Sequence, residues 1–89
     1  MKLNETIQLM TSESYHDRFK AEYYQLVIRY KRLVKRMQMW DEGTLDFTPN
    51  CPRGTYNLQM KFMADYIAVL ETRAAIEGIE LEDVEIESY

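Results

Sequence analysis

The sequence predicts an all-α protein: a short N-terminal helix followed by an antiparallel hairpin of two long helices. Two observations support this fold class. Apolar residues recur at heptad spacing in two long segments, and a loop with two prolines separates these segments. We expect one domain over residues 1–89, with helices at 4–10, 14–41 and 55–77 and an acidic tail at 78–89.

The first long helix is expected to begin at Ser14, because Asp17 three residues later resembles a capping box; Ser12 is a near-equal alternative cap. We expect Asn4 to cap the short helix before it. No proline or glycine then occurs up to Trp40. Apolar residues in this segment follow at spacings of 4, 4, 3, 4, 3, 4 and 3, which predicts lengthwise packing on a partner helix: Tyr15, Phe19, Tyr23, Leu26, Tyr30, Leu33, Met37 and Trp40.

The second long helix carries a matching apolar seam. Its spacings are 4, 3, 4, 3 and 4: Tyr56, Met60, Met63, Ile67, Leu70 and Ala74. Gly43 and Gly78 are suited to the left-handed position that ends a helix. Pro49 and Pro52 keep the connecting loop non-helical. Two seams joined by a short loop predict an antiparallel hairpin.

Both helices have more apolar surface than one hairpin can bury. The first carries an additional set, Tyr24, Val27, Ile28 and Val34, and the second carries Phe62, Tyr66, Val69 and Ile76. An exposed patch of this size favours aggregation or association. We therefore predict a homo-oligomer with the second set at its interface. The alternative is that the short N-terminal helix covers the surplus.

Composition argues against an enzyme. The chain has one histidine, one cysteine and three scattered glycines among 89 residues, so we expect no cofactor, no metal set and no phosphate-binding glycine loop. His16 and Asp17 are sequence neighbours and do not share a helix face, and Cys51 has no base beside it. The lone thiol favours a reducing, cytoplasmic setting, and we expect no signal peptide and no membrane span.

The net charge of −4 conceals two opposite segments. Residues 77–89 contain six acids and no base, and residues 15–40 contain seven basic residues against two acids. These bases interleave with Tyr23, Tyr24 and Tyr30, a combination that suits phosphate and nucleobase binding: Arg18, Lys20, Arg29, Lys31, Arg32, Lys35 and Arg36. The alternative is a solvated face that balances the tail. The negative tail would repel duplex nucleic acid, so a compact anion held between chains is favoured.

The segment after Gly78 alternates apolar and acidic residues without a heptad. It also lacks the ligand order of a calcium loop. We expect a docked edge segment or a frayed tail that the fold does not need.

Residues 14–26, 59–66 and 70–77, with the loop 40–52, resemble a group of short phage and prophage proteins of gut bacteria. The order of a short helix, a tyrosine-led long helix and a helix with Phe62-Met63-Ala64 is also similar to the phage anti-CBASS cyclic-nucleotide sponges and the hairpin domain of the anti-Thoeris sponges. This resemblance implies a cytoplasmic helical oligomer, commonly a hexamer. It would sequester cyclic di- and trinucleotide immune signals between chains without cleaving them.

The resemblance also implies site residues. The family's binding tyrosine falls on Tyr15 and its binding lysine near Lys31, with Arg18 and Lys35 adding charge at the rim. The family's trinucleotide-binding arginine has no clear match, and Arg73 is the candidate. His16 stands where those proteins often have arginine.

Two hypotheses follow. The first is a phage anti-defence sponge for cyclic oligonucleotides. The second is an oligomeric helical module that binds a host protein through its acidic tail or its loop.

Overall fold

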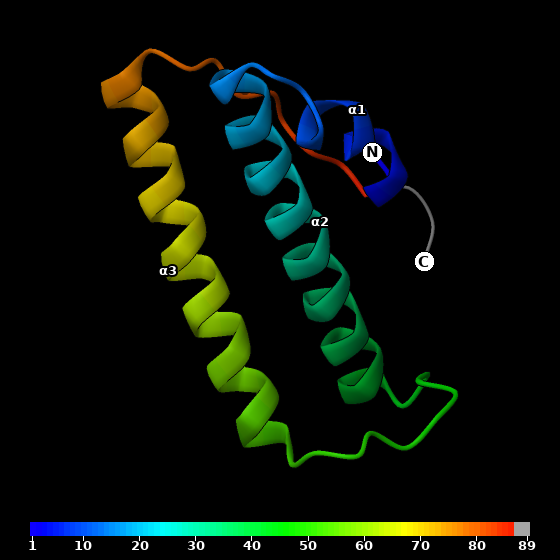
Figure 1. Ribbon diagram of the computed structural model, residues 1–89. Coiled ribbons are helices and arrows are strands. Elements are labelled where there is room, and N and C mark those ends of the chain that lie inside the picture. The colour runs from blue at the N-terminus through cyan, green and yellow to red at the C-terminus, as the bar shows by residue number, and fades with distance from the viewer. Residues whose placement is uncertain (87–89) are drawn as a thin grey trace.

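The computed structural model describes residues 1–86, and that part of the chain is all-helical, as the sequence predicts. A 3₁₀ turn η1 (Leu3–Thr6) runs into the short helix α1 (Ile7–Met10), and two long helices follow, α2 (Tyr15–Glu42) and α3 (Arg53–Glu77). Figure 1 shows α2 and α3 lying antiparallel along the length of the molecule, which measures 43 × 23 × 20 Å.

Local capping fixes where the long helices begin and end. Ser14 is the N-cap of α2, and its Oγ accepts a hydrogen bond from the Asp17 N–H at 3.5 Å. Gly43 and Gly78 follow α2 and α3 with φ values of 74° and 71°, a region in which a side chain costs energy. The connecting loop contains two prolines, and α3 begins directly after the second of them, with Pro52 as its N-cap.

Helix α2 lies at the centre of the molecule. Helix α3 packs along one side of it, and η1, α1 and the chain after Gly78 pack on the opposite side (Figure 1). Both sides share one hydrophobic core, whose buried members are Phe19, Tyr23, Tyr24, Val27, Ile28, Leu70, Ala74, Ile79 and Val84. A helix with apolar residues on two sides is satisfied in this way by neighbours from both ends of the chain.

Of the two alternatives for the acidic tail, the docked segment is confirmed as far as residue 86, and its burial in the core argues against the expectation that the fold does not need it. Ile79 and Val84 are among the most buried residues of the chain, and Ile86 packs against the same core. The Met1 ammonium donates to the Glu85 carbonyl, so the two ends of the described chain meet (Figure 1). The apolar residues between the acids explain this docking, since each buried Val or Ile side chain contributes about 1.5–3 kcal/mol. Residues 87–89 of the expected tail lie outside the described residues.

The surplus apolar residues of the two long helices have different outcomes. On α2, Tyr24, Val27 and Ile28 are buried by the N-terminal segment and the tail, and Val34 is half-buried. For this set the alternative of cover by the N-terminal helix is therefore confirmed in part, with the tail as the second cover. On α3, the second set remains on the surface, where Phe62 is 60 % and Ile76 is 79 % exposed. Of the two long helices, α3 is the one that the rest of residues 1–86 leaves with an uncovered apolar face.

Candidate ligand-binding surfaces

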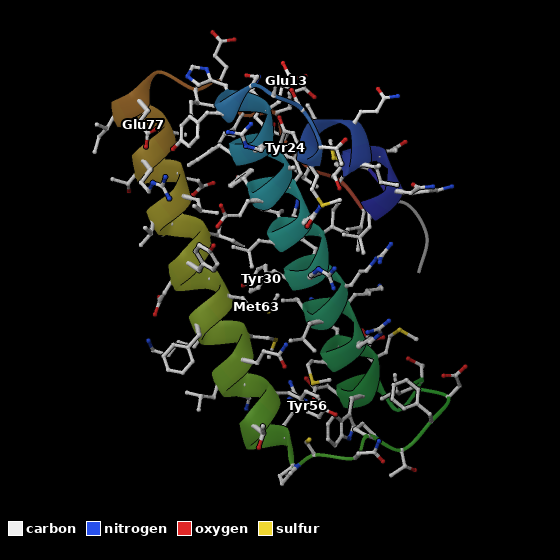
Figure 2. All side chains as sticks on the ribbon, in the orientation of Figure 1. Glu13, Tyr24, Tyr30, Tyr56, Met63 and Glu77 are labelled. Atoms are coloured by element: carbon white, nitrogen blue, oxygen red, sulfur yellow. The ribbon has the colours of Figure 1, made fainter. Side chains whose placement is uncertain are left out.

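Two of the residues implicated by sequence resemblance meet at the end of the hairpin where α2 begins and α3 ends. The Tyr15 hydroxyl accepts a hydrogen bond from Arg73 Nη2 at 2.9 Å and donates one to Glu77 Oε1 at 2.8 Å. Figure 2 shows Glu77 in the last turn of α3, beside the first turn of α2. Tyr15 keeps 45 % of its surface exposed, so its ring remains accessible while its hydroxyl is held.

The Arg73 guanidinium is held by three neighbours. Its Cζ lies 5.0 Å from the centre of the Phe19 ring, and its Nε donates to Glu77 Oε2 at a long 3.4 Å. Desolvation acts to lower the pKa of Arg73, but Tyr15 and Glu77 outweigh it and raise that pKa. An exposed pair of this length contributes little stability, so an incoming anion can replace Glu77 at low cost.

Lys31 lies in a different environment, on the side of α2 that the tail covers. Its Nζ donates to the backbone carbonyl of Val84. Tyr24 holds the tail about two turns earlier on α2 (Figure 2), where its hydroxyl accepts a hydrogen bond from the Glu82 N–H at 3.2 Å. The proposed phosphate ligand Lys31 therefore acts in this structure as an anchor for the tail.

The hollow beside Lys31 is acidic. It measures about 380 Å³ and includes Glu71, Asp83 and Glu85 in its lining. Tyr23 also lines it and donates to Glu71 Oε2 at 2.8 Å. Burial, the hydrogen bond to Glu71 and the charge of Asp83 raise the pKa of Tyr23 to about 12. Three carboxylates around one ammonium oppose the binding of a phosphate at this place.

The predicted residues do not form one site within a single chain. Tyr15 and Lys31 are sixteen residues apart on α2, which corresponds to about 24 Å along the helix axis. Arg18 donates from Nη1 to the Ser12 carbonyl at 2.9 Å, near the N-terminal end of α2. Lys35 is exposed one turn beyond Lys31. The structure thus joins Tyr15 to Arg73 and leaves Lys31 and Lys35 apart from them.

Arg29 is the residue that the sequence-based site set missed. It contributes to three neighbouring hollows of about 330, 360 and 310 Å³ on the side of α2 away from Lys31. A signal for it was present in the sequence. Arg18, Arg29 and Arg36 are spaced by 11 and 7 residues, and both spacings return to nearly the same helix face.

The outer face of α3 carries the four residues expected at an oligomer interface, and Leu58 extends it. Phe62, Val69 and Ile76 recur every seven residues, and all are more than half exposed. Tyr66 is exposed beside them, with its hydroxyl donating to Glu22 on α2. Three large apolar side chains at heptad spacing form the kind of seam that a second helix covers.

Other chemistry is sparse in the described chain. No group of three His, Cys, Asp or Glu side chains within residues 1–86 is arranged to hold a metal ion. Cys51 lies exposed in the loop before α3. Neither long helix, nor any other helix in this part of the chain, combines the length and hydropathy that a membrane crossing requires.

The described chain is an all-helical hairpin with basic and aromatic side chains exposed on its long helices. The chain belongs to the Sequestin family, whose pattern it matches over residues 13–76, from the turn before α2 almost to the end of α3. The family name points to sequestration, which is a binding role rather than a catalytic one. Comparisons with curated proteins and with solved structures gave no match.

Proposed function

We propose that this chain is a phage anti-defence protein that binds cyclic di- or trinucleotide immune signals and holds them without cleaving them. Membership of the Sequestin family supports a sequestering role. The observation that carries the nucleotide assignment is the contact between Tyr15 and Arg73, 58 residues apart in sequence. It places an accessible aromatic ring beside a guanidinium, the pair of groups that suits a base and its phosphate.

In the proposed complex the Tyr15 ring stacks on a base and Arg73 turns from Glu77 to a phosphate. The Tyr15–Glu77 and Arg73–Glu77 contacts keep both side chains near their working positions before the ligand arrives. Base stacking on an aromatic ring contributes about 1–3 kcal/mol. A charge-assisted hydrogen bond to phosphate adds about 1.5–3 kcal/mol.

Lys31, Lys35 and Arg18 belong to the same proposal through a neighbouring chain. A separation of about 24 Å along α2 is too long for one compact ligand to touch both Tyr15 and Lys31 of the same chain. A second copy that lies alongside can bring its Lys31 to the Tyr15 of the first. A phosphate at Lys31 would replace the Val84 carbonyl, because a charged acceptor forms the stronger hydrogen bond, and the bound state would have to move the tail carboxylates Asp83 and Glu85 away from the ammonium.

The proposed oligomer uses the outer face of α3. Phe62, Tyr66, Val69 and Ile76 are its interface residues, and a hexamer is the assembly that the sponge resemblance implies. Burial of each large apolar side chain contributes about 1.5–3 kcal/mol to association, before the cost of lost motion.

Titration calorimetry with cyclic di- and trinucleotides tests the function. We expect Tyr15→Ala and Lys31→Ala each to weaken binding by about tenfold or more, because one loses a stacking ring and the other a phosphate contact. Tyr15→Phe is the matched control, since it keeps the ring and should retain most of the affinity. The nucleotide released by heating should be chemically intact.

Absence of binding heat with every cyclic di- and trinucleotide, at ligand concentrations of tens of micromolar, would contradict the sponge assignment. Binding that both alanine variants leave unchanged would move the pocket away from Tyr15 and Lys31. A pull-down that recovers one host protein in place of a nucleotide would favour the alternative, an oligomeric helical module that binds a host protein.

A further inference from the structure

A groove runs along the side of α2 that faces away from the tail. Its first hollow, about 330 Å³, is walled by Met10 of α1 and Tyr66 of α3 and has Leu26 of α2 in its lining. Most of its lining is apolar. Three segments distant in sequence therefore build one surface with an apolar floor, of the volume that small-molecule sites typically have.

Arginines mark both ends of this hollow and continue beyond it. Arg18 and Arg29 line the first hollow, and Arg29 also lines a second of about 360 Å³ together with Arg32 and Arg36. The second hollow is more polar than the first. The groove thus changes from an apolar floor to a basic stretch in the direction of the α2 C-terminus.

Arg29 stands at the junction of these hollows and is exposed. Among residues 1–86 it takes part in no hydrogen bond or ion pair, whereas Arg32 and Arg36 each already have an interaction. Glu22 is the acid that lines the first hollow, and it already accepts a hydrogen bond from Tyr66. An available guanidinium with two further arginines beyond it favours an anion here, in contrast to the acidic hollow beside Lys31.

We propose that this groove is a second ligand site, independent of the Tyr15 site, for a compound of the nucleoside diphosphate class. The ring lies on the apolar floor of the first hollow between Met10 and Tyr66. The diphosphate extends to Arg29, whose planar fork suits phosphate oxygens, and continues toward Arg32 and Arg36. A phosphate there competes with the contacts that Arg32 and Arg36 already make.

The chemistry of the two hollows selects this class over simpler anions. Inorganic pyrophosphate can use the arginines but leaves the apolar floor in water, and adenosine uses the floor without the charge. A ligand with both parts gains from each, so ADP should bind more tightly than either fragment. The groove lies on the opposite side of α2 from residues 78–86 of the tail, so occupation does not require that part of the chain to move.

Calorimetry of the full chain with ADP, adenosine and pyrophosphate tests this site. We expect Arg29→Ala to weaken ADP binding by about tenfold or more, and Arg29→Lys to recover only part of that loss, because lysine keeps the charge without the fork. Lys20→Ala is the matched control: it removes one positive charge from α2 outside the groove lining, and we expect a change below about twofold.

Three results would each overturn the proposed groove site. The first is no ADP binding at about 1 mM, a concentration at which even a millimolar complex would be visible. The second is an equal loss of ADP affinity in the Arg29 and Lys20 variants, and the third is pyrophosphate binding as tightly as ADP. Circular dichroism of each variant separates loss of binding from loss of fold. Tyr15→Ala should leave ADP binding unchanged. A chain that binds ADP and no cyclic nucleotide would contradict the proposed sponge function and support the groove site. A chain that binds a cyclic nucleotide and no ADP would support the sponge function and contradict the groove site.

Discussion

Helices α2 and α3 have similar lengths, 28 and 25 residues, and each carries two apolar stripes, but only α2 has both stripes covered. One stripe of α2 faces α3, and the other is buried under the N-terminal segment and the tail. Helix α3 buries Leu70 and Ala74 against α2 and exposes its opposite face. The same sequence signal, a surplus of apolar residues on a helix, therefore has two different structural outcomes in one chain.

The difference follows from where the remaining chain can reach. Gly78 turns the chain after α3 back over α2, so that Ile79 and Val84 pack against α2 and leave the outer face of α3 uncovered. The N-terminal turn and helix add to the same side of α2. Both ends of the described chain thus cover one helix. An apolar stripe shows that a helix needs cover, but not whether its own chain supplies it.

The largest effect is expected when the same change, isoleucine to alanine, is made separately in each long helix and the two variants are compared. Ile28→Ala on α2 removes a side chain that is fully buried, and we expect a loss of about 2–5 kcal/mol in the free energy of unfolding. The thermal midpoint should fall by at least about 8 °C, since 1 kcal/mol corresponds to roughly 4–8 °C in a domain of this size.

Ile76→Ala on α3 is the control for that experiment. This side chain is 79 % exposed in one chain, so the unfolding free energy of the separated chain should change by no more than about 0.5 kcal/mol. Differential scanning calorimetry at low protein concentration measures both variants. Equal losses would contradict the comparison between a doubly covered and a singly covered helix.

A second prediction concerns the uncovered face itself. Phe62→Glu places a charge where we propose a chain–chain contact, and light scattering should show the assembly mass falling to that of one chain. The cost is several kcal/mol in association, because the carboxylate would lose its water without gaining a partner; about 1.4 kcal/mol already changes the dissociation constant tenfold. Helicity should persist, since Phe62 packs into no intrachain core.

Gln38→Glu makes the same change of charge at an exposed position of α2 and should leave the mass unchanged. A wild-type chain that scatters as a monomer at micromolar concentration would remove the proposed oligomer. The proposed cyclic-nucleotide pocket would then have to lie within one chain, at Tyr15 and Arg73.

The helical class was predictable because heptad spacing and glycine stops are local signals. Ser14, Gly43 and Gly78 act through their own backbone and the residues next to them, so their roles can be read from spacing alone. The docking of Ile79 and Val84 was not predictable in this way. Their alternation with acids fits an exposed edge as well as a buried strap, and the choice depends on the shape of α2 and α1.

The same distinction applies to the candidate site, where the sequence named residues but only the fold shows which of them meet. The resemblance to the sponge family implied both Tyr15 and Arg73 as site residues, but only the packing of α2 against α3 brings their polar atoms to 2.9 Å. The position of Lys31 on a basic helix predicted an anion site, whereas the tail surrounds it with carboxylates from 52 to 54 residues later. Arg29 was one member of a long basic set, and only the hollows on either side distinguish it.

The smallest effect tests how tightly α2 is joined to α3 and the tail through Tyr23. The pKa of this tyrosine is about 12 in the folded chain, against about 10 in an unfolded one. A proton is therefore held more strongly in the folded state, so the contribution to stability is complete below about pH 10 and is lost between about pH 10 and 12. Because solvent partly screens the hydroxyl, the expected loss in the free energy of unfolding is about 1–2 kcal/mol, less than the full pKa difference would give.

Urea unfolding of the wild type and Tyr23→Phe at a series of pH values from about 8 to 11.5 measures this contribution. The phenylalanine variant lacks the hydrogen bond to Glu71, so it should be less stable near neutral pH by about 1.5–3 kcal/mol. It also lacks the titrating group, and the gap between the two proteins should narrow above about pH 10. Lysines and other tyrosines titrate in both proteins and cancel in the difference. A gap that stays constant across the series would show that Tyr23 titrates as an ordinary surface tyrosine and does not couple α2 to α3 and the tail.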